Sequence, residues 1–269
     1  MKIPTNYLCP LCQQSLVLKG KSYVCDNNHS FDLAKQGYVN LLPVQFKHSK
    51  TPGDNKTMVD ARRAFLDKGF YQPLVDKMLA LYQQYGGGNA PLLDAGCGEG
   101  FYTHQFKTSN NQVYGVDIAK ETIKIAAKRY QACHFSVGTL SKLSFADHYF
   151  DFLISVYAPI LDAEFTRVLQ NNGYLLTVTP AELHLYELKQ LIYRQANEHD
   201  VNKSPVEKLI LVEEQRLTYP MNFENSADVL NLLSMTPFAF KATEQLIAKI
   251  KTIKKFSCQA DFVLRLYKK

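Results

Sequence analysis

Two features are missing from the 269-residue sequence: it has no tryptophan, and it has no long hydrophobic run. The first absence excludes nothing. The second excludes a membrane-spanning helix, since the longest apolar run, residues 152–161, falls well short of the ~20 residues that cross a bilayer. The opening residues, MKIPTNYLCP, also lack the apolar core of a signal peptide. We therefore expect a soluble, cytoplasmic protein with no membrane partner.

Over most of the chain, positive and negative charges balance. The net charge is +6, and residues 241–269 alone give +6, because eight Lys and Arg residues there face only Glu244 and Asp261. A basic C-terminal segment is compatible with a polyanionic partner. It is equally compatible with an ordinary solvated surface rich in lysine.

The composition is that of a globular protein. Hydrophobic residues make up 46% of the chain and aromatic residues 12%, which supports a sizeable core and excludes global disorder. The length exceeds one average domain. We expect a small N-terminal unit at residues 1–40, a basic loop with linker helices at 41–85, and a larger unit at 86–269.

Disulfides are not expected among the six cysteines, because a reducing compartment does not favour them. Cys97, Cys133 and Cys258 are scattered, and we expect the last two to be small buried hydrophobic residues on strands. The other three lie near the N-terminus with a histidine, in the segment CPLCQQSLVLKGKSYVCDNNH.

This segment has the spacing C-x2-C-x12-C-x3-H, formed by Cys9, Cys12, Cys25 and His29. Two close pairs around a short hairpin, with predicted strands at 15–18 and 22–24, allow four ligands to converge tetrahedrally on zinc. Since protein fills all four positions, the ion would be structural, in a zinc ribbon or treble clef. The alternatives are coincidental cysteines and a redox CxxC. A segment with so little core needs the ion, and no βαβ pattern surrounds the motif.

A basic loop follows at residues 43–56, and it serves equally well as a linker or as a nucleic-acid contact. Its basic residues are Lys47, His48, Lys50 and Lys56. The preceding residues 31–42 are expected to pack the zinc segment onto the next unit. Helices are predicted at 57–68 and 72–85, and the second ends in three glycines.

The stretch APLLDAGCGEGFYT, residues 90–103, combines a short buried strand, a glycine turn at 96–100 and the start of a helix. This is the pattern of the first βα unit of a doubly wound sheet. Glycines let the backbone approach a ligand, and the helix N-terminus offers N–H groups. The dinucleotide fingerprint G-x-G-x-x-G is missing, because counting from Gly96 its last position is Phe101.

Strands and helices alternate along the following residues. The alternation predicts an α/β fold: a doubly wound, mostly parallel Rossmann-like sheet, with the small zinc ribbon at its N-terminus. The predicted strands are 112–117, 133–137, 150–157, 174–179, 209–223 and 257–267. The predicted helices are 121–130, 162–169, 185–195, 227–233 and 243–250, with a turn at 171–173.

The glycine turn reads D-x-G-x-G-x-G and so resembles the motif of class I S-adenosylmethionine-dependent methyltransferases. The resemblance implies S-adenosylmethionine as cofactor and an antiparallel strand pair at one sheet edge. It places four residues at the methionine end: Asp94, Gly96, Gly98 and Gly100. Asp117 ends the next strand, about 20 residues on, where a carboxylate meets the ribose hydroxyls. The acid that many members place against adenine is missing from residues 138–141, so backbone groups near Thr139 and Leu140 are expected to replace it.

Nearly the whole chain is similar to the bacterial 23S rRNA (guanine-N1-)-methyltransferase family. The likeness rests on the cysteine motif followed by FDLAKQGYVNLL, DNKTMVDARRAFLDKGFYQPL and LDAGCGEGFYT, then YAP at 157–159 and TPAELHLYELK at 179–189. It implies methyl transfer to one guanine in a hairpin loop of 23S rRNA. It also implies cofactor contacts at Tyr71, Gly98, Glu99 and His184. From the residues alone, Tyr71 and His184 are more typical of packing or surface positions.

The resemblance gives the zinc segment a role in RNA recognition. A rigid, metal-held knuckle presents backbone and basic groups, and RNA loops are read through splayed bases, stacking and phosphate contacts. The expected RNA contacts are Lys19, Lys21, Lys35 and the loop at 47–56.

Guanine N1 carries a proton that must leave on methylation, so the site needs a base or hydrogen bonds to the developing charge. Tyr157 lies at the end of the fourth strand, where it either stacks on a flipped guanine or only caps the sheet, and Pro159 shapes the loop. Asp162 is a candidate base but is more typical of a residue that starts a helix. No proton acceptor is assigned.

Two other functions fit the same residues. A non-catalytic RNA-binding protein with a vestigial cofactor fold is disfavoured by the intact glycine turn and Asp117. A small-molecule methyltransferase would use zinc only to brace the fold. The sequence leaves open which guanine is modified and which oligomeric state the chain adopts, a homodimer included.

Overall fold

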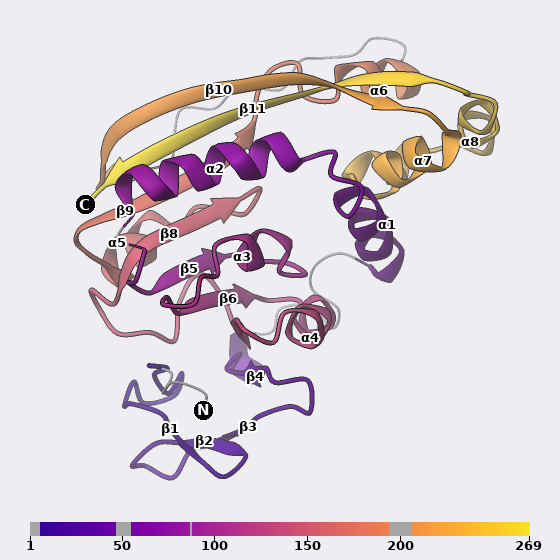
Figure 1. Cartoon of the computed structure of the whole chain (residues 1–269). Coiled ribbons are helices and arrows are strands. Elements are labelled where there is room, and N and C mark those ends of the chain that lie inside the picture. The colour runs from indigo at the N-terminus through magenta and orange to yellow at the C-terminus, as the bar shows by residue number, and fades with distance from the viewer. Residues whose placement is uncertain (1–5, 47–54, 87, 194–205) are drawn as a thin grey trace.

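A computed structural model describes residues 6–46, 55–86, 88–193 and 206–269. Its centre is an eight-stranded sheet in the order β10-β11-β9-β8-β5-β6-β7-β4 (Figure 1). The strands from β4 to β9 pair in parallel, and β11 runs antiparallel to both β9 and β10. The predicted fold class is confirmed, as is the antiparallel pair at one edge. The strands are β4 (Val39–Asn40), β5 (Leu92–Ala95), β6 (Val113–Asp117), β7 (His134–Val137), β8 (Phe150–Val156), β9 (Leu169–Pro180), β10 (Ile210–Phe223) and β11 (Phe256–Lys268).

Alternate residues of the central strands face two separate cores. Leu92 and Ile154 belong to the core on one face, and Leu93 and Leu153 to the core on the other. Because both faces are buried, these strands are almost entirely hydrophobic, as in other parallel sheets. Helices α2 (Gln72–Tyr85), α3 (Phe101–Gln105) and α4 (Lys120–Arg129) contribute to the first core, and α5 (Asp162–Val168) to the second.

Helices α1, α6, α7 and α8 lie near the end of the sheet where β10 finishes (Figure 1). Helix α1 begins after Asn55, whose side chain accepts the N–H of Met58 at 3.0 Å. This is a stabilising N-cap. Helix α1 packs against α7, and α7 packs against α8. The bounds of these helices are α1 (Lys56–Leu66), α6 (Tyr186–Ile192), α7 (Ser226–Ser234) and α8 (Glu244–Lys251). Two 3₁₀ helices, η1 (Val44–Phe46) and η2 (Pro237–Lys241), follow β4 and α7 along the chain.

The turn predicted at 171–173 is instead part of a continuous strand. Phe150 pairs with Leu169 and Phe152 with Tyr174, so the extra residues of β9 form a bulge between them. Asn172 adopts a φ of 66°, which Asn tolerates better than most residues. The N–H of Asn172 donates to the carbonyl of Lys269, so pairing with the chain end extends the strand across the turn residues.

The N-terminal segment forms its own small antiparallel sheet and packs on the large one. This sheet consists of β1 (Val17–Lys19), β2 (Ser22–Val24) and β3 (Ser30–Asp32). Tyr7 is buried with its ring edge-on to Tyr114 of β6, 5.8 Å between centroids. Strand β4 then adds to the edge of the large sheet beside β7. Residues 31–42 therefore pack the N-terminal segment onto the next unit, as predicted.

Two cysteines expected on strands are both buried, but Cys133 lies one residue before β7, whereas Cys258 lies on β11. The predicted loop residues Lys47, His48 and Lys50, and the end of the helix predicted at 185–195, fall outside the described residues. Across the described ranges, every helix is too short or too polar to traverse a bilayer.

Candidate functional site: a metal group and a strand-end cavity

Four candidate metal ligands converge in the N-terminal segment. The ligand atoms of Cys9, Cys12, Cys25 and His29 all lie within 4.8 Å of one another. The Sγ atoms of Cys12 and Cys25 are 3.6 Å apart, and His29 Nδ1 lies 3.4 Å from Cys9 Sγ and 3.5 Å from Cys25 Sγ. Bonds of about 2.0–2.3 Å to a tetrahedral zinc ion require ligand separations of roughly 3.4–3.8 Å. The three separations above fit that geometry.

Each ligand pair is held by a tight turn. The N–H of Gln13 donates to the carbonyl of Cys9 at 2.8 Å, and the N–H of Asn28 donates to the carbonyl of Cys25 at 2.9 Å. Both Gln13 and Asn28 have a φ of 61°, in the left-handed region. These turns aim two ligands of a pair at one point. With all four positions supplied by protein, the group suits a structural ion.

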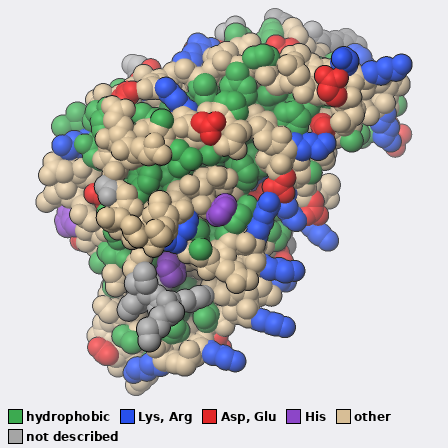
Figure 2. Space-filling model, in the orientation of Figure 1, with side chains coloured by type: hydrophobic (Ala, Val, Ile, Leu, Met, Phe, Trp, Pro, Cys, Tyr) green, Lys and Arg blue, Asp and Glu red, His purple; other side chains and the backbone are tan. Residues whose placement is uncertain are grey.

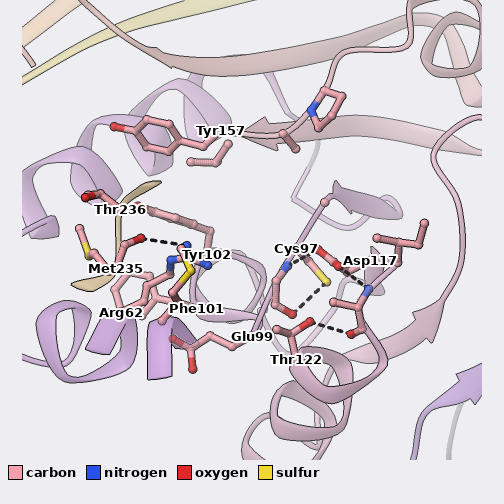
Figure 3. Close-up of a pocket in the computed structure, with 18 of the residues that line it drawn as sticks. Arg62, Cys97, Glu99, Phe101, Tyr102, Asp117, Thr122, Tyr157, Met235 and Thr236 are labelled. Atoms are coloured by element: carbon pink, nitrogen blue, oxygen red, sulfur yellow. Dashed lines mark hydrogen bonds between the residues drawn. The ribbon is translucent and has the colours of Figure 1, made fainter. Parts of the chain in front are cut away.

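A cavity of about 840 Å³ lies at the carboxyl ends of β5, β6 and β8 (Figure 3). This is the edge at which doubly wound sheets bind ligands. Its floor is the turn at 96–99, and one wall is α1, through Met58, Arg62 and Leu66. Residues 235–238 also line it, and Arg62 Nη2 donates to the carbonyl of Met235 at 3.3 Å.

Two of the three predicted glycines lie in the cavity lining. Gly96 has a φ of 84°, and a Cβ there would come within 2.4 Å of the Ala158 Cβ. Gly98 has a φ of 53° and faces open space. Gly100 is outside the lining, and a Cβ there would meet the ring of Phe135 at 2.8 Å. The first two glycines therefore shape the cavity, whereas the third permits close packing of helix on sheet.

Asp94 lies beneath the turn and outside the cavity lining. Its carboxylate is buried and accepts a hydrogen bond from Thr103 Oγ1 at 2.6 Å. Burial raises the pKa of Asp94 to about 7, although the hydrogen bond from Thr103 opposes the rise. The side chain ties the end of β5 to α3, so it supports the turn from below.

Asp117 lies at the end of β6, as predicted, and it lines the cavity (Figure 3). Its Oδ2 accepts the N–H of Gly98 at 2.9 Å, and its Oδ1 accepts the N–H of Ala119 at 2.8 Å. These bonds fix the carboxylate beside the glycine turn. Thr139, Leu140 and Ser141 line the cavity nearby.

Glu99 is buried in the cavity floor, and one of its two carboxylate oxygens accepts a hydrogen bond. Arg63 Nε of α1 donates to Glu99 Oε2 at 3.1 Å. Glu99 Oε1 is buried and has no hydrogen-bond partner among the described residues. Burial raises the pKa of Glu99, and the hydrogen bond and charge of Arg63 oppose that rise. A buried unpaired carboxylate oxygen is costly, so it fits a site that receives a donor from a ligand.

Tyr71, Tyr157 and His184 meet at one end of the cavity. His184 Nε2 lies 3.3 Å from the Tyr71 hydroxyl and 3.1 Å from the Tyr157 hydroxyl. The N–H of Asp261 donates to His184 Nδ1 at 3.2 Å. All three side chains line the cavity. The structure therefore brings together two residues that composition and spacing would not select.

Asp261 is held firmly behind His184. Arg216 donates to both carboxylate oxygens of Asp261, at 2.8 Å and 2.6 Å, and Thr218 Oγ1 donates at 2.7 Å. The N–H of Leu183 donates to the same carboxylate at 3.1 Å. Burial alone would raise the pKa of Asp261, but these donors hold it below its usual value. The carboxylate thus fixes the turn that carries His184.

Tyr157 is strained and half-exposed at the end of β8. Its φ of 56° is unusual for an aromatic residue, and its exposed fraction is 44%. Pro159 also lines the cavity, whereas Asp162 does not. Asp162 Oδ2 accepts the N–H groups of Glu207 and Lys208, at 3.0 Å and 3.1 Å. Helix α5 begins at Asp162, but the carboxylate anchors a neighbouring segment.

Several cavity residues were not selected from the sequence. Arg62 lines the cavity and its neighbour Arg63 contacts Glu99, but nothing in the spacing of the segment DNKTMVDARRAFLDKGFYQPL singles out either residue. Thr236 and Phe238 come from a segment about 140 residues after the glycine turn. Only the packing of α7 on α1 brings them to the cavity.

Two family models match the chain. A zinc-ribbon model described as "RlmA, N-terminal" matches residues 7–50, which include the metal group. A model described as "Methyltransferase domain" matches residues 93–177, which include the glycine turn.

Individual relatives extend the likeness. A Bacillus subtilis (strain 168) protein named "Putative 23S rRNA (guanine-N(1)-)-methyltransferase YxjB" is 30% identical over 270 residues, covering 95% of this chain and 94% of that protein. The Streptomyces fradiae 23S rRNA (guanine(748)-N(1))-methyltransferase is 33% identical over 185 residues, covering 67% of this chain and 65% of that protein. A malonyl-[acyl-carrier protein] O-methyltransferase of Hamiltonella defensa is 29% identical over 119 residues, but it covers 42% of this chain and 46% of that protein. The first likeness spans the metal group and the cavity alike.

Proposed function

This chain belongs to the 23S rRNA (guanine-N1-)-methyltransferase family, and from that premise we propose its activity. It transfers the methyl group of S-adenosylmethionine to N1 of a guanine in a hairpin loop of 23S rRNA. The observation that carries the proposal is a likeness over 95% of the chain, which joins the metal group to the cavity. A likeness to the methyltransferase part alone would leave the substrate open, as the acyl-carrier-protein relative illustrates.

The cavity residues fit S-adenosylmethionine, whose sulfonium supplies an activated methyl group. Gly96 and Gly98 leave room for the methionine end, and Glu99 Oε1 offers an acceptor for its ammonium group. Asp117 would accept the ribose hydroxyls. Thr139 and Leu140 line the region where backbone groups would meet adenine. Tyr71 and His184 close the opposite end of the cavity.

The same cavity has room for a target base beside the cofactor. Its volume of about 840 Å³ lies near the top of the range for ligand sites, roughly 300–1,000 Å³. Tyr157 presents a half-exposed ring from a strained backbone, which suits stacking on a flipped guanine. Pro159 limits the neighbouring loop. The chain's part in methyl transfer is to hold the base in line and exclude water.

We assign RNA contact to the metal-held segment. Lys19, Lys21 and Lys35 are exposed there, and Lys56 is exposed at the start of α1. Basic side chains on a rigid support suit the phosphates of a folded RNA. The loop at 47–54 lies outside the described residues, so its part in this contact stays a sequence prediction.

The activity is tested with purified protein, S-adenosylmethionine and 23S rRNA, followed by mass-spectrometric mapping of the methylated nucleotide. We expect 1-methylguanosine in one hairpin loop. RNA that already carries a methyl group on that N1 should accept none. Transfer to another atom, or transfer to small acyl substrates with none to RNA, would contradict the proposal.

Asp117 provides a matched pair of variants for the same assay. Asp117→Asn keeps the acceptor oxygen for the Gly98 N–H but loses charge, whereas Asp117→Ala loses both. We expect S-adenosylmethionine affinity to fall in the order wild type, Asn, Ala. RNA affinity measured without cofactor should stay unchanged in both variants.

A further inference from the structure

Exposed aromatic side chains gather around the cavity. Among the aromatic side chains that the structure describes, three are exposed: Tyr157 at 44%, Tyr193 at 38% and Phe240 at 75%. Tyr157 lines the cavity. The ring of Tyr193 lies edge-on to Phe238, with 6.2 Å between centroids, and Phe238 also lines the cavity. Phe240 follows two residues later in η2.

This concentration has a physical meaning. A large aromatic ring that stays exposed to water does not gain the free energy of burial. A cluster of exposed rings therefore indicates a binding surface more strongly than a single exposed ring does. Here Tyr193 and Phe240 come from segments after α6 and after α7, which meet through contacts between α6 and η2. Two segments that meet each other therefore each carry an exposed ring, and one of these rings, Tyr193, packs on the cavity residue Phe238.

Most of the exposed charges on the segment that follows Phe240 are positive, although Glu244 at the start of α8 is exposed as well. Lys241 directly follows Phe240 and is exposed, and Lys249 and Lys251 are exposed on α8. Figure 2 shows Lys and Arg side chains, with some Asp and Glu side chains among them, at the end of the molecule where α8 lies. Aromatic platforms combined with basic side chains suit single-stranded nucleic acid, in which bases stack and phosphates meet lysines. An apolar protein partner would offer no negative charge for these lysines to contact.

We propose that Tyr193 and Phe240 form a stacking surface for the unpaired nucleotides that flank the target guanine. This inference rests on the proposed function, and it adds a second RNA contact on the opposite side of the cavity from the metal group. Tyr157 receives the target base inside the cavity, while Tyr193 and Phe240 hold its neighbours outside. The surface therefore favours a loop over a duplex, because paired bases cannot offer their faces.

Alanine variants test the surface by RNA affinity. We expect Phe240→Ala and Tyr193→Ala each to weaken binding of the hairpin by roughly five- to 150-fold, since stacking on one aromatic ring contributes about 1–3 kcal/mol per base. Phe240→Tyr should retain affinity and Phe240→Leu should not, because only the first keeps a π face. S-adenosylmethionine affinity should be unchanged. Ile210→Ala is the matched control, because Ile210 is 73% exposed at the far end of β10.

The lack of tryptophan gives a direct readout. In Phe240→Trp the new indole is the only one in the protein, and stacking on a base should quench its fluorescence. We expect quenching by the stem-loop and little by a blunt duplex with the same stem. Ile210→Trp should respond to neither RNA.

The outcomes separate this inference from the proposed function. If the wild type methylates 23S rRNA while both alanine variants bind it normally and the Phe240→Trp emission is unaffected, the stacking surface is refuted and the function stands. If the wild type transfers no methyl group to RNA, the function fails, and the fluorescence response alone decides the surface. Quenching by an added protein fraction but by no RNA would also refute it.

Discussion

His184 has its hydrogen-bonding role set by its neighbours. The backbone N–H of Asp261 points at Nδ1, so Nδ1 is the acceptor and the proton of the neutral ring sits on Nε2. This assignment follows from the partners. Nε2 then donates toward the hydroxyls of Tyr71 and Tyr157. His184 therefore acts as a fixed donor in the cavity and is not the acceptor of the guanine proton.

Variants of His184 distinguish a donor from a base. In His184→Gln the side-chain amide can still donate toward Tyr157, whereas in His184→Ala nothing replaces the imidazole. We expect the Ala variant to lose about tenfold or more in kcat/KM, which corresponds to a lost buried hydrogen bond of 1–3 kcal/mol, and the Gln variant to recover part of it. A Gln variant as inactive as the Ala variant, or an NMR spectrum with the proton on Nδ1, would contradict the donor role.

Site residues could be predicted where their spacing along the chain defines a motif. Site residues that only tertiary packing brings together could not be predicted. The four ligands from Cys9 to His29 and the acid Asp117 lie at fixed distances along the chain from turns and strand ends. Gly100 obeys the same motif as Gly96, yet it packs on Phe135, because the motif does not say which glycine faces the ligand. Tyr71 and His184 meet across 113 residues, and only the resemblance pointed to them.

At the scale of elements, helix α1 forms one wall of the cavity and also contacts the glycine turn that forms the cavity floor. Arg63 of α1 donates to Glu99, while Met58 and Arg62 line the cavity directly. Burial raises the pKa of Glu99 and Arg63 opposes the rise. Any change that removes Arg63 should therefore raise the pKa of Glu99 further and leave more of the carboxyl neutral at a given pH.

Arg63→Met tests this coupling between α1 and the glycine turn. Because the neutral form accumulates as pH falls, S-adenosylmethionine affinity of the variant should begin to weaken at a higher pH than that of the wild type. Arg63→Lys keeps the charge and should resemble the wild type. Calorimetric titration at several pH values measures the effect. Identical pH dependence in the wild type and the Met variant would contradict the coupling of Arg63 to Glu99.

The ends of helices and strands could be predicted where residues typical of such ends occur in the sequence. Helix α2 spans 72–85 as predicted, since Pro73 lies in its first turn and Gly86 follows its last residue. The bulge of β9 was not predictable. Asn and Gly at 171–173 are typical of a turn, and only pairing with β8 and the chain end makes these residues part of a strand.

At the scale of the whole molecule, the metal-held segment and the large sheet share one hydrophobic core. Cys9, Cys25 and Tyr7 belong to the same buried cluster as Tyr114 and Phe150 of the sheet. The N–H of Leu8 donates to the carbonyl of Ser144 at 2.8 Å. Division of the chain at residue 40 stays a prediction, but these contacts imply that the segment and the sheet lose stability together.

Removal of zinc should therefore destabilise the entire protein in one transition. Structural zinc contributes about 10–16 kcal/mol in small peptides, and each kcal/mol shifts Tm by roughly 2–4 °C in a domain of this size. If even part of that free energy stabilises the sheet, removal of zinc should lower Tm by more than ~10 °C. We expect this for Cys25→Ser and for wild type treated with a chelator, with recovery of the treated wild type on adding zinc.

Cys133→Ala is the matched control, because Cys133 is buried in the other core and takes no part in the metal group. It should lower Tm by only a few degrees, as expected for loss of a small buried side chain at about 1 kcal/mol. Two separate calorimetric transitions in zinc-depleted protein, the larger at the wild-type temperature, would show that the segment folds independently. A single transition at a lower temperature would instead mean that the zinc ion stabilises the sheet that carries the cavity, through the rings of Tyr7 and Tyr114.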